Sequence, residues 1–176
     1  MNQYFCKTLF FLVVLFSHAN GFGQKEGNYQ GMHWQIKGSN HVDVSLIVDG
    51  KSVLNNRTQI FLREIGGKLY FAGEKKNSEG HYVQELFSIK GEKVIPYEYS
   101  SMEVYTKEEK GWDFVVIDRF LPNYNMLLYS VDLKLICSNI AGIPSIKTYE
   151  GVGGNLLEVE TKQDGEFVQN LYTSEQ

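Results

Sequence analysis

The sequence predicts an all-β protein made of short antiparallel strands, and three observations support this prediction. Beyond residue 24 no window keeps apolar residues at the i, i+3, i+4, i+7 spacing of a helix, whereas short alternating runs recur between clusters of Gly, Asn, Asp or Lys. The 176 residues include 11 Tyr and 11 Phe, which favour strands, and 17 Gly, which favour turns. A strand-and-turn pattern also recurs roughly every 42 residues.

The first element is a predicted secretory signal peptide, residues 1–23. A short segment carrying Lys7 precedes the apolar run Thr8–Phe16, and small or polar residues follow it. A membrane-spanning helix needs roughly 20 apolar residues, so this run is too short to span and has the size and flanks of a signal peptide. We expect cleavage after Gly21 or Gly23 and export to the periplasm, the cell surface or the medium. An N-terminal core strand or an uncleaved anchor is the alternative.

The rest of the chain, residues 24–176, is predicted to form one domain of successive strands. Each run alternates apolar and polar side chains, as expected of a strand with one buried face, and is bounded by turn-forming residues. In chain order the clearest runs cover residues 42–48, 59–65, 68–72, 82–89, 112–117, 126–131, 156–159 and 167–173. Together with weaker runs they predict about ten to thirteen strands and no helix.

A fixed period relates these strands to one another. Gly80–Ser88 aligns with Gly165–Thr173, and the same register includes Pro122–Ser130 and Asn40–Val48. The alignment superposes four leucines at spacings of 40, 42 and 43 residues: Leu46, Leu86, Leu128 and Leu171. Several strands in each repeat are typical of β-propellers, whose blades bury their faces only against neighbouring blades. We therefore expect an antiparallel repeat sheet of propeller-blade type, with chance similarity between alternating strands as the alternative.

The second repeat resembles bacterial β-propeller repeats of the ELWxxDGT type, in which a GKLYF-like strand precedes an ELW-like strand and a turn. Gly66–Glu74 matches the first strand and Glu85–Gly91 the second, with Phe87 where the family has Trp and Lys90 in place of Asp. Ile89–Tyr99 is also similar to WG-type repeats, although the Trp-Gly pair is missing. Each resemblance covers one repeat well and the others poorly. Both imply an exported β-repeat scaffold and no particular activity.

A closed lipocalin-like β-barrel is the alternative architecture. Gly31–Trp34 resembles the Gly-x-Trp near the first strand of lipocalins, with one residue inserted. The repeats also leave a difficulty, because four blades are about the minimum for a closed propeller and the fourth unit lacks a visible connecting segment. The chain would then form a minimal propeller, an open row that pairs with another copy or partner, or a fragment of a longer ancestor.

Composition argues against several classes of function. Lys and Arg total 17 against 21 for Asp and Glu, a net charge of -4, which leaves no basic excess for a nucleic-acid partner. Cys6 lies in the leader, so the mature chain has only Cys137, which we expect to be a small buried hydrophobe without a disulfide. Nucleophile-elbow, phosphate-loop and zinc-protease motifs are missing from the sequence, and we expect neither cofactor nor metal.

Two polar patterns still offer chemistry. His33 and His41, with Asp43 nearby, could be gathered by a hairpin as metal ligands, but solvated turn positions explain them better. Glu158 and Glu160 share one strand face because side chains alternate. A pair of carboxylates is the machinery of glycoside hydrolysis, yet alternation on a solvated sheet face explains this pair as well.

Large aromatic side chains are the predicted partner contacts, because they are rigid, stack on sugars and anchor protein interfaces. The candidates are Trp34, Trp112, Tyr97 and Tyr99. The predicted function is an exported, non-enzymatic binding or scaffold module that acts through its β-repeat surface. A protein or a carbohydrate is the expected partner, with no stable membrane span and with self-association through sheet edges. A lipocalin-like carrier of a small ligand and a carboxylate-based hydrolase are the alternatives.

Overall fold

The structure is a computed structural model that describes residues 25–39, 42–106, 113–119, 125–148 and 155–173, all in strands, turns or extended connections. The predicted signal peptide lies outside these residues. The described strands are β1 (Lys25–Tyr29), β2 (Met32–Ser39), β3 (Val42–Val48), β4 (Lys51–Arg57), β5 (Gln59–Ile65), β6 (Lys68–Lys76), β7 (Tyr82–Ser88), β8 (Ser101–Tyr105), β9 (Phe114–Arg119), β10 (Asn125–Ser130), β11 (Leu135–Ile140), β12 (Ser145–Thr148), β13 (Asn155–Gln163) and β14 (Glu166–Tyr172). The predicted all-β class is confirmed.

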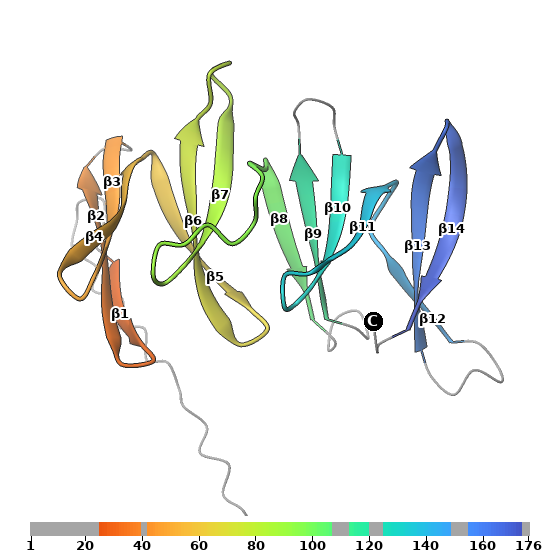
Figure 1. The fold of residues 1–176 in the computed structure, drawn as a ribbon, viewed down its shortest axis with the longest axis horizontal. Coiled ribbons are helices and arrows are strands. Elements are labelled where there is room, and N and C mark those ends of the chain that lie inside the picture. Colours follow the sequence, from red (N-terminus) through yellow and green to blue (C-terminus); the bar gives the residue numbers. More distant parts are fainter. Residues whose placement is uncertain (1–24, 40–41, 107–112, 120–124, 149–154, 174–176) are drawn as a thin grey trace, which may run out of the picture.

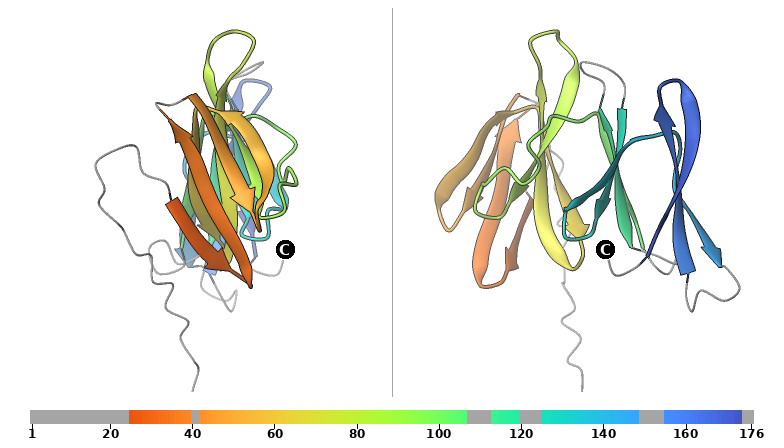
Figure 2. Two further views of the ribbon diagram at one scale, coloured as in Figure 1. Left: turned by 90° about the vertical axis from the view of Figure 1, so that its left-hand side faces the viewer. Right: turned by 45° about the vertical axis from the view of Figure 1, so that its right-hand side comes forward.

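The strands form a row of antiparallel groups (Figure 1). Group 1 contains β1–β4, group 2 contains β5–β7, group 3 contains β8–β11 and group 4 contains β12–β14. Groups 3 and 4 belong to one seven-stranded sheet, but a single residue pair, Ile140 with Thr161, joins them. Seen along the row, the groups lie behind one another (Figure 2, left).

Tight turns set the register within the groups. In the turn before β6, Gly66 and Gly67 have φ of 56° and 69°, and in the turn before β14, Asp164 and Gly165 have φ of 49° and 90°. Two successive positive φ values are characteristic of the two-residue turns that match the twist of a hairpin. These turns explain why the predicted glycine clusters coincide with the strand boundaries.

The core is divided among the spaces between neighbouring groups. Trp34 and Leu46 of group 1 pack against Phe71 and Phe87 of group 2. Similar apolar clusters join group 2 to group 3, around Leu86, Tyr99, Val115 and Ile117, and group 3 to group 4, around Phe114, Leu128, Leu157 and Val159. Each interior group therefore buries both of its faces, which is how stacked repeats stabilise one another.

The predicted period corresponds to a structural repeat. The four aligned leucines each lie on the third strand of their group, on β3, β7, β10 and β14. Leu46, Leu86 and Leu128 are fully buried against the next group in the row. Leu171 occupies the same position in the last group, where the described residues provide no further group, and it is 49% exposed.

The lipocalin-like barrel alternative is wrong, because the sheets do not close on one another. A barrel would enclose one interior, whereas here the apolar side chains are shared among separate clusters between stacked groups. Trp34, which suggested the barrel, packs between groups 1 and 2. The described residues contain fourteen strands, more than the predicted ten to thirteen, because short strands such as β12 carry little alternation.

Candidate functional site

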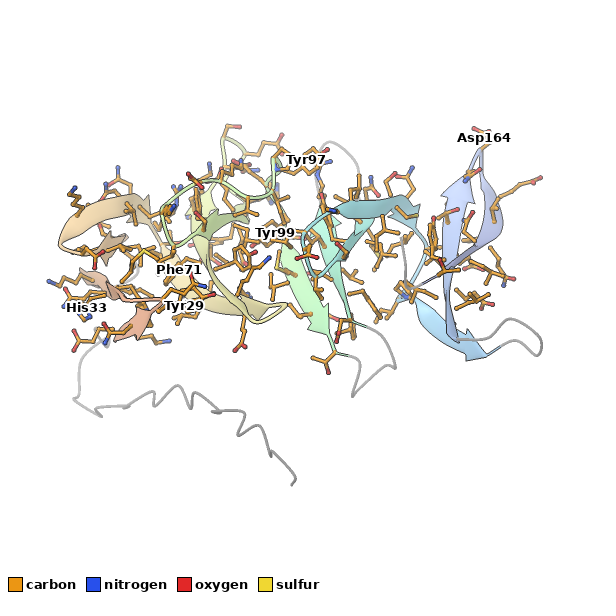
Figure 3. All side chains as sticks on the ribbon, turned by 60° about the horizontal axis from the view of Figure 1, so that its bottom comes forward. Tyr29, His33, Phe71, Tyr97, Tyr99 and Asp164 are labelled. Atoms are coloured by element: carbon orange, nitrogen blue, oxygen red, sulfur yellow. The ribbon has the colours of Figure 1, made fainter. Side chains whose placement is uncertain are left out.

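A hollow of about 220 Å³ lies between groups 2 and 3. Its walls come from the β6–β7 loop, the start of β7, the segment that leads from β7 to β8, and the last residue of β9. Figure 3 labels two of its residues, Tyr97 and Tyr99, in this part of the row. The lining residues are Asn77, His81, Val83, Pro96, Tyr97, Glu98, Tyr99 and Arg119.

Backbone hydrogen bonds hold the β7–β8 segment against β7 and so fix this wall. The Gln84 amide donates to the Tyr99 carbonyl at 2.7 Å, and the Tyr99 amide donates back to the Gln84 carbonyl at 3.0 Å. On the opposite rim, the Asn77 carboxamide oxygen accepts from the amides of Glu79 and His81, both at 3.0 Å. Such side-chain bonds to the backbone are typical of Asn in turns.

Tyr97 and Arg119 form a cation–π pair in the wall of the hollow. The Arg119 guanidinium carbon lies 4.2 Å from the centre of the Tyr97 ring. A cation over an aromatic face at this distance is attracted by the ring quadrupole. Because Arg119 ends β9 and Tyr97 lies on the β7–β8 segment, the pair joins groups 2 and 3. It stacks a positive charge on one face of an aromatic ring in the wall.

A cluster of charges supports the hollow from within group 2. Glu85, only 7% exposed, accepts hydrogen bonds from Arg57 at 3.0 Å and Lys93 at 2.9 Å, and it lies 3.2 Å from the Lys75 ammonium. Lys75 also lies 2.8 Å from Glu98, which lines the hollow. Since Arg57 ends β4, the cluster connects group 1 to the wall of the hollow.

The pKa values of this cluster favour its charged form. Burial raises the pKa of Glu85, but the hydrogen bonds and positive charges of Lys93 and Lys75 outweigh burial and hold the pKa below its ordinary value. Burial lowers the pKa of Lys75, but hydrogen bonds and charge from Glu98 and Glu85 outweigh it and raise the pKa. Both groups are therefore ionised at neutral pH and fix Glu98 in place.

A glycine makes room for the cluster. Gly73 lies directly opposite Glu85 on β6, and a Cβ atom there would lie 2.9 Å from the Arg57 Nε. The sequence contained one sign of the cluster that our predictions did not use. Val83, Glu85 and Phe87 lie on one face of β7, so Glu85 interrupts an apolar alternation with a charge.

The structure brings together two of the four predicted contact residues. Tyr97 is half-buried in the hollow, and Tyr99, 1% exposed, lies beneath it in the core between groups 2 and 3. Burial raises the pKa of Tyr99, and its hydroxyl is buried without a hydrogen-bond partner among the described residues. Trp34 is in another part of the molecule, 4% exposed and edge-on to Phe71. Trp112 lies outside the described residues.

Sequence reasoning missed most of the polar lining, in particular Asn77, His81, Glu98 and Arg119. Tyr97 precedes β8 and Arg119 is the last residue of β9, so only the pairing of β8 with β9 brings the two together. The WG-like segment that contains Tyr97 and Glu98 was the one local indication. The remaining residues have no common pattern in the sequence.

A second hollow of about 540 Å³ also lies between groups 2 and 3, at the other end of the paired strands β8 and β9. Its lining includes Glu64, Tyr105, Asp113 and Val131, together with the Gly66 and Gly67 turn. Glu158 and Glu160, the carboxylates considered for hydrolysis, lie elsewhere, on the face of β13 that points away from group 3.

The structure also describes the surroundings of two other residues considered for chemistry, His33 and Cys137. His33 Nε2 lies 4.0 Å from Glu26, and His41 is outside the described residues. Among the residues that the structure describes, no group of three or more His, Cys, Asp or Glu side chains could hold a metal ion. Cys137 packs at the boundary of groups 3 and 4 beside Tyr172, whose pKa is raised to about 12 by burial and by its hydrogen bond with Cys137.

Two findings complete the description of the chain. No helix within the described residues has the length and apolar character needed to cross a bilayer. The chain matches no protein-family model, no curated protein and no solved structure. The hollow at Tyr97 therefore provides the argument for function through its own chemistry.

Proposed function

We propose that the protein is an exported, non-enzymatic binding module that holds a small polar ligand, a single sugar ring, in the hollow at Tyr97. The observation that supports this proposal is the pairing of Tyr97 with Arg119 at 4.2 Å in a hollow that the polar residues Asn77, His81 and Glu98 also line. The open row of groups acts as the scaffold that positions this wall.

The lining has the chemistry that a sugar requires. Sugar hydroxyls both donate and accept hydrogen bonds; Glu98 offers acceptors, and Arg119 and the Asn77 carboxamide nitrogen offer donors. The C–H faces of a sugar ring pack on aromatic surfaces, and the Tyr97 face opposite Arg119 would supply such a surface. The volume of about 220 Å³ is below the roughly 300–1,000 Å³ of pockets for larger ligands, which favours one ring over a peptide segment.

Export and the scaffold role rest on different evidence. Export is supported by the leader-like residues 1–23. The scaffold role is supported by the stacked groups and by the resemblance to exported propeller-type repeats, and membership in those repeats remains a prediction. A sugar-binding surface is consistent with a protein that operates outside the cytoplasm.

Calorimetric titration of the purified protein with a panel of mono- and disaccharides would test the proposal. We expect at least one sugar to bind, and Tyr97→Ala to weaken that binding by about tenfold or more, which corresponds to about 1.4 kcal/mol. Tyr82→Ala is the matched control, because Tyr82 is an exposed tyrosine on β7 outside the hollow lining. Binding that survives Tyr97→Ala unchanged, or no binding by any sugar, would contradict the proposal.

A further inference from the structure

Among the residues that the structure describes, no strand pairs with the outer edge of β14, whereas the third strand of every other group is paired on that edge. In groups 1 and 3 the third strand pairs with a fourth, β4 or β11. In group 2 the β7–β8 segment takes this place through bridges from Lys93 to Phe87 and from Tyr99 to Gln84. Within the described residues β14 pairs with β13 alone, and it lies at the end of the row (Figure 1).

This edge also lacks the features by which proteins usually protect an exposed strand. β14 pairs with β13 over seven consecutive residues without a bulge, and its one charged residue is Glu166 at the start. Edge strands are normally blunted by charges, bulges or shortness. β1 shows this protection with Lys25 and Glu26 in five residues, and β4 shows it with irregular register against β3.

Two apolar side chains lie along the unprotected edge. Phe167 is 64% exposed and Leu171 49% exposed. Tyr172 packs toward group 3, and side chains alternate along a strand, so Phe167 and Leu171 point away from group 3 on one common face. A seven-residue strand with an open hydrogen-bonding edge and two exposed apolar side chains is a site for adding another strand.

We propose that β14 pairs antiparallel with β14 of a second copy of this chain, about a two-fold axis at Gln169. A two-fold axis perpendicular to the sheet makes each face of one copy continuous with the same face of the other copy. Directly opposite residues must share a face, so the axis must pass beside a residue and not between two residues. Centred at Gln169, it places Phe167 opposite Leu171 of the second copy, and Leu171 opposite Phe167 of the second copy. Centred at Val168 or Asn170, it would leave one of the two apolar side chains opposite a glutamine.

The charges around the edge are compatible with this register. On β13, Lys162 lies beside Phe167 and Glu158 beside Leu171. Each line of neighbouring side chains across the joined sheet then contains Lys162, Phe167, Leu171 of the second copy and Glu158 of the second copy. The two ends of this line carry opposite charges. Glu166 falls opposite Tyr172 of the second copy, so no like charges lie directly opposite each other.

The outer faces of the row are less suitable for contact than the edge. The residue opposite the repeated leucine is Ile36, Ala72 or Val116 in the first three groups but Glu158 in group 4. At the other end, Gln35 stands where groups 2, 3 and 4 have buried Phe71, Val115 and Leu157. Gln35 on the end face of group 1 and Glu158 on that of group 4 therefore stand where stacking needs apolar residues, although Phe167 and Leu171 share the group 4 face with Glu158.

Light scattering during size-exclusion chromatography tests the proposal. We expect light scattering to give the wild-type protein a mass of two chains at micromolar concentration. Phe167→Lys and Leu171→Lys should each weaken the dimer by tenfold or more, because each substitution affects both copies of the pair. Leu135→Lys is the matched control, since Leu135 is also 49% exposed but lies on β11. A strictly monomeric wild type, or a dimer that survives both β14 substitutions, overturns the proposal.

Cross-linking tests the register itself. In a background with Cys6 and Cys137 replaced by alanine, Gln169→Cys should form a disulfide-linked dimer, because directly opposite Cβ atoms lie within about 5.5 Å. Val168→Cys and Asn170→Cys should not, since neither residue faces its own copy. The double variant Phe167→Lys with Leu171→Glu should restore the dimer. Cross-linking at position 168 or 170 instead refutes this register, and sugar binding at Tyr97 should be unchanged throughout.

Discussion

Glu85 shows how one buried carboxylate can organise a neighbourhood of the fold. Its three cationic partners come from β4, from β6 and from the β7–β8 segment, which have no local relation in the sequence. A buried charge of this kind persists only when its partners are in place, because removing one side leaves the other uncompensated. The side chain thus contributes more to the position of the hollow wall than to its chemistry.

Glu85→Gln should lower the free energy of unfolding by about 3 kcal/mol, because Arg57, Lys75 and Lys93 would lose their common carboxylate. Urea unfolding at pH 7 measures this difference. Glu64→Gln is a suitable control, since Glu64 is an exposed carboxylate on β5, and it should change stability by less than about 0.5 kcal/mol. An equally small effect for both variants would contradict the role assigned to Glu85.

The pH dependence of this difference follows from the direction of the Glu85 pKa. The pKa is lower in the folded state than the ordinary value of 4.5, so the stabilisation is present above pH 4.5 and is lost as the pH falls through the folded pKa. The gap between wild type and Glu85→Gln should therefore be constant from pH 6 to 8 and shrink below pH 4.5. A gap that widens on acidification would show that the sign is wrong.

At the scale of elements, the sequence predicted strands and their period well but not their contacts. Alternation and glycine turns are local properties, so the third strands with their repeated leucines could be read directly from spacing. The candidate hollow could not, because the contact of Tyr97 with Arg119 depends on the pairing of β8 with β9 and on the stacking of groups 2 and 3. Tyr97 was identified by residue type alone, and its cationic partner had no sequence signal.

Close packing of β1 on β2 provides a test of the first group. A Cβ atom at Gly27 would lie 2.6 Å from Trp34 Cζ2, and Trp34 packs edge-on against Phe71 of group 2. Gly27→Ala should therefore displace the indole and destabilise the protein by about 1–3 kcal/mol. Gly142→Ala is the control, because a Cβ atom at Gly142 would have no described neighbour within 4 Å and the φ of this glycine is not in the left-handed region. Thermal unfolding of both variants measures the contrast.

On the scale of the whole molecule, the outer faces decide between an open row and a closed ring. Every interior boundary joins apolar side chains, whereas the face of group 1 that points away from group 2 carries His33, Gln35 and Glu26. Closing the row would remove these polar groups and Glu158 of group 4 from water, and burying polar and charged groups is costly. The repeat could be predicted from the sequence, but the open row could not. Whether the row closes depends on the polar residues on the outer faces of its first and last groups.

Export of the chain is the remaining prediction at this scale. The first described residue is Lys25, which begins β1 and pairs with Ile36. Cleavage after Gly21 or Gly23 would therefore leave every pair of the first group intact, and the mature chain would start at Phe22 or Gln24. N-terminal sequencing of protein recovered from outside the cytoplasm checks this start. Replacing Val13 and Leu15 in the apolar run by aspartate should retain the chain inside the cell with Met1 uncleaved, and an uncleaved wild-type chain found only in the cytoplasm would show that the leader is not a signal peptide.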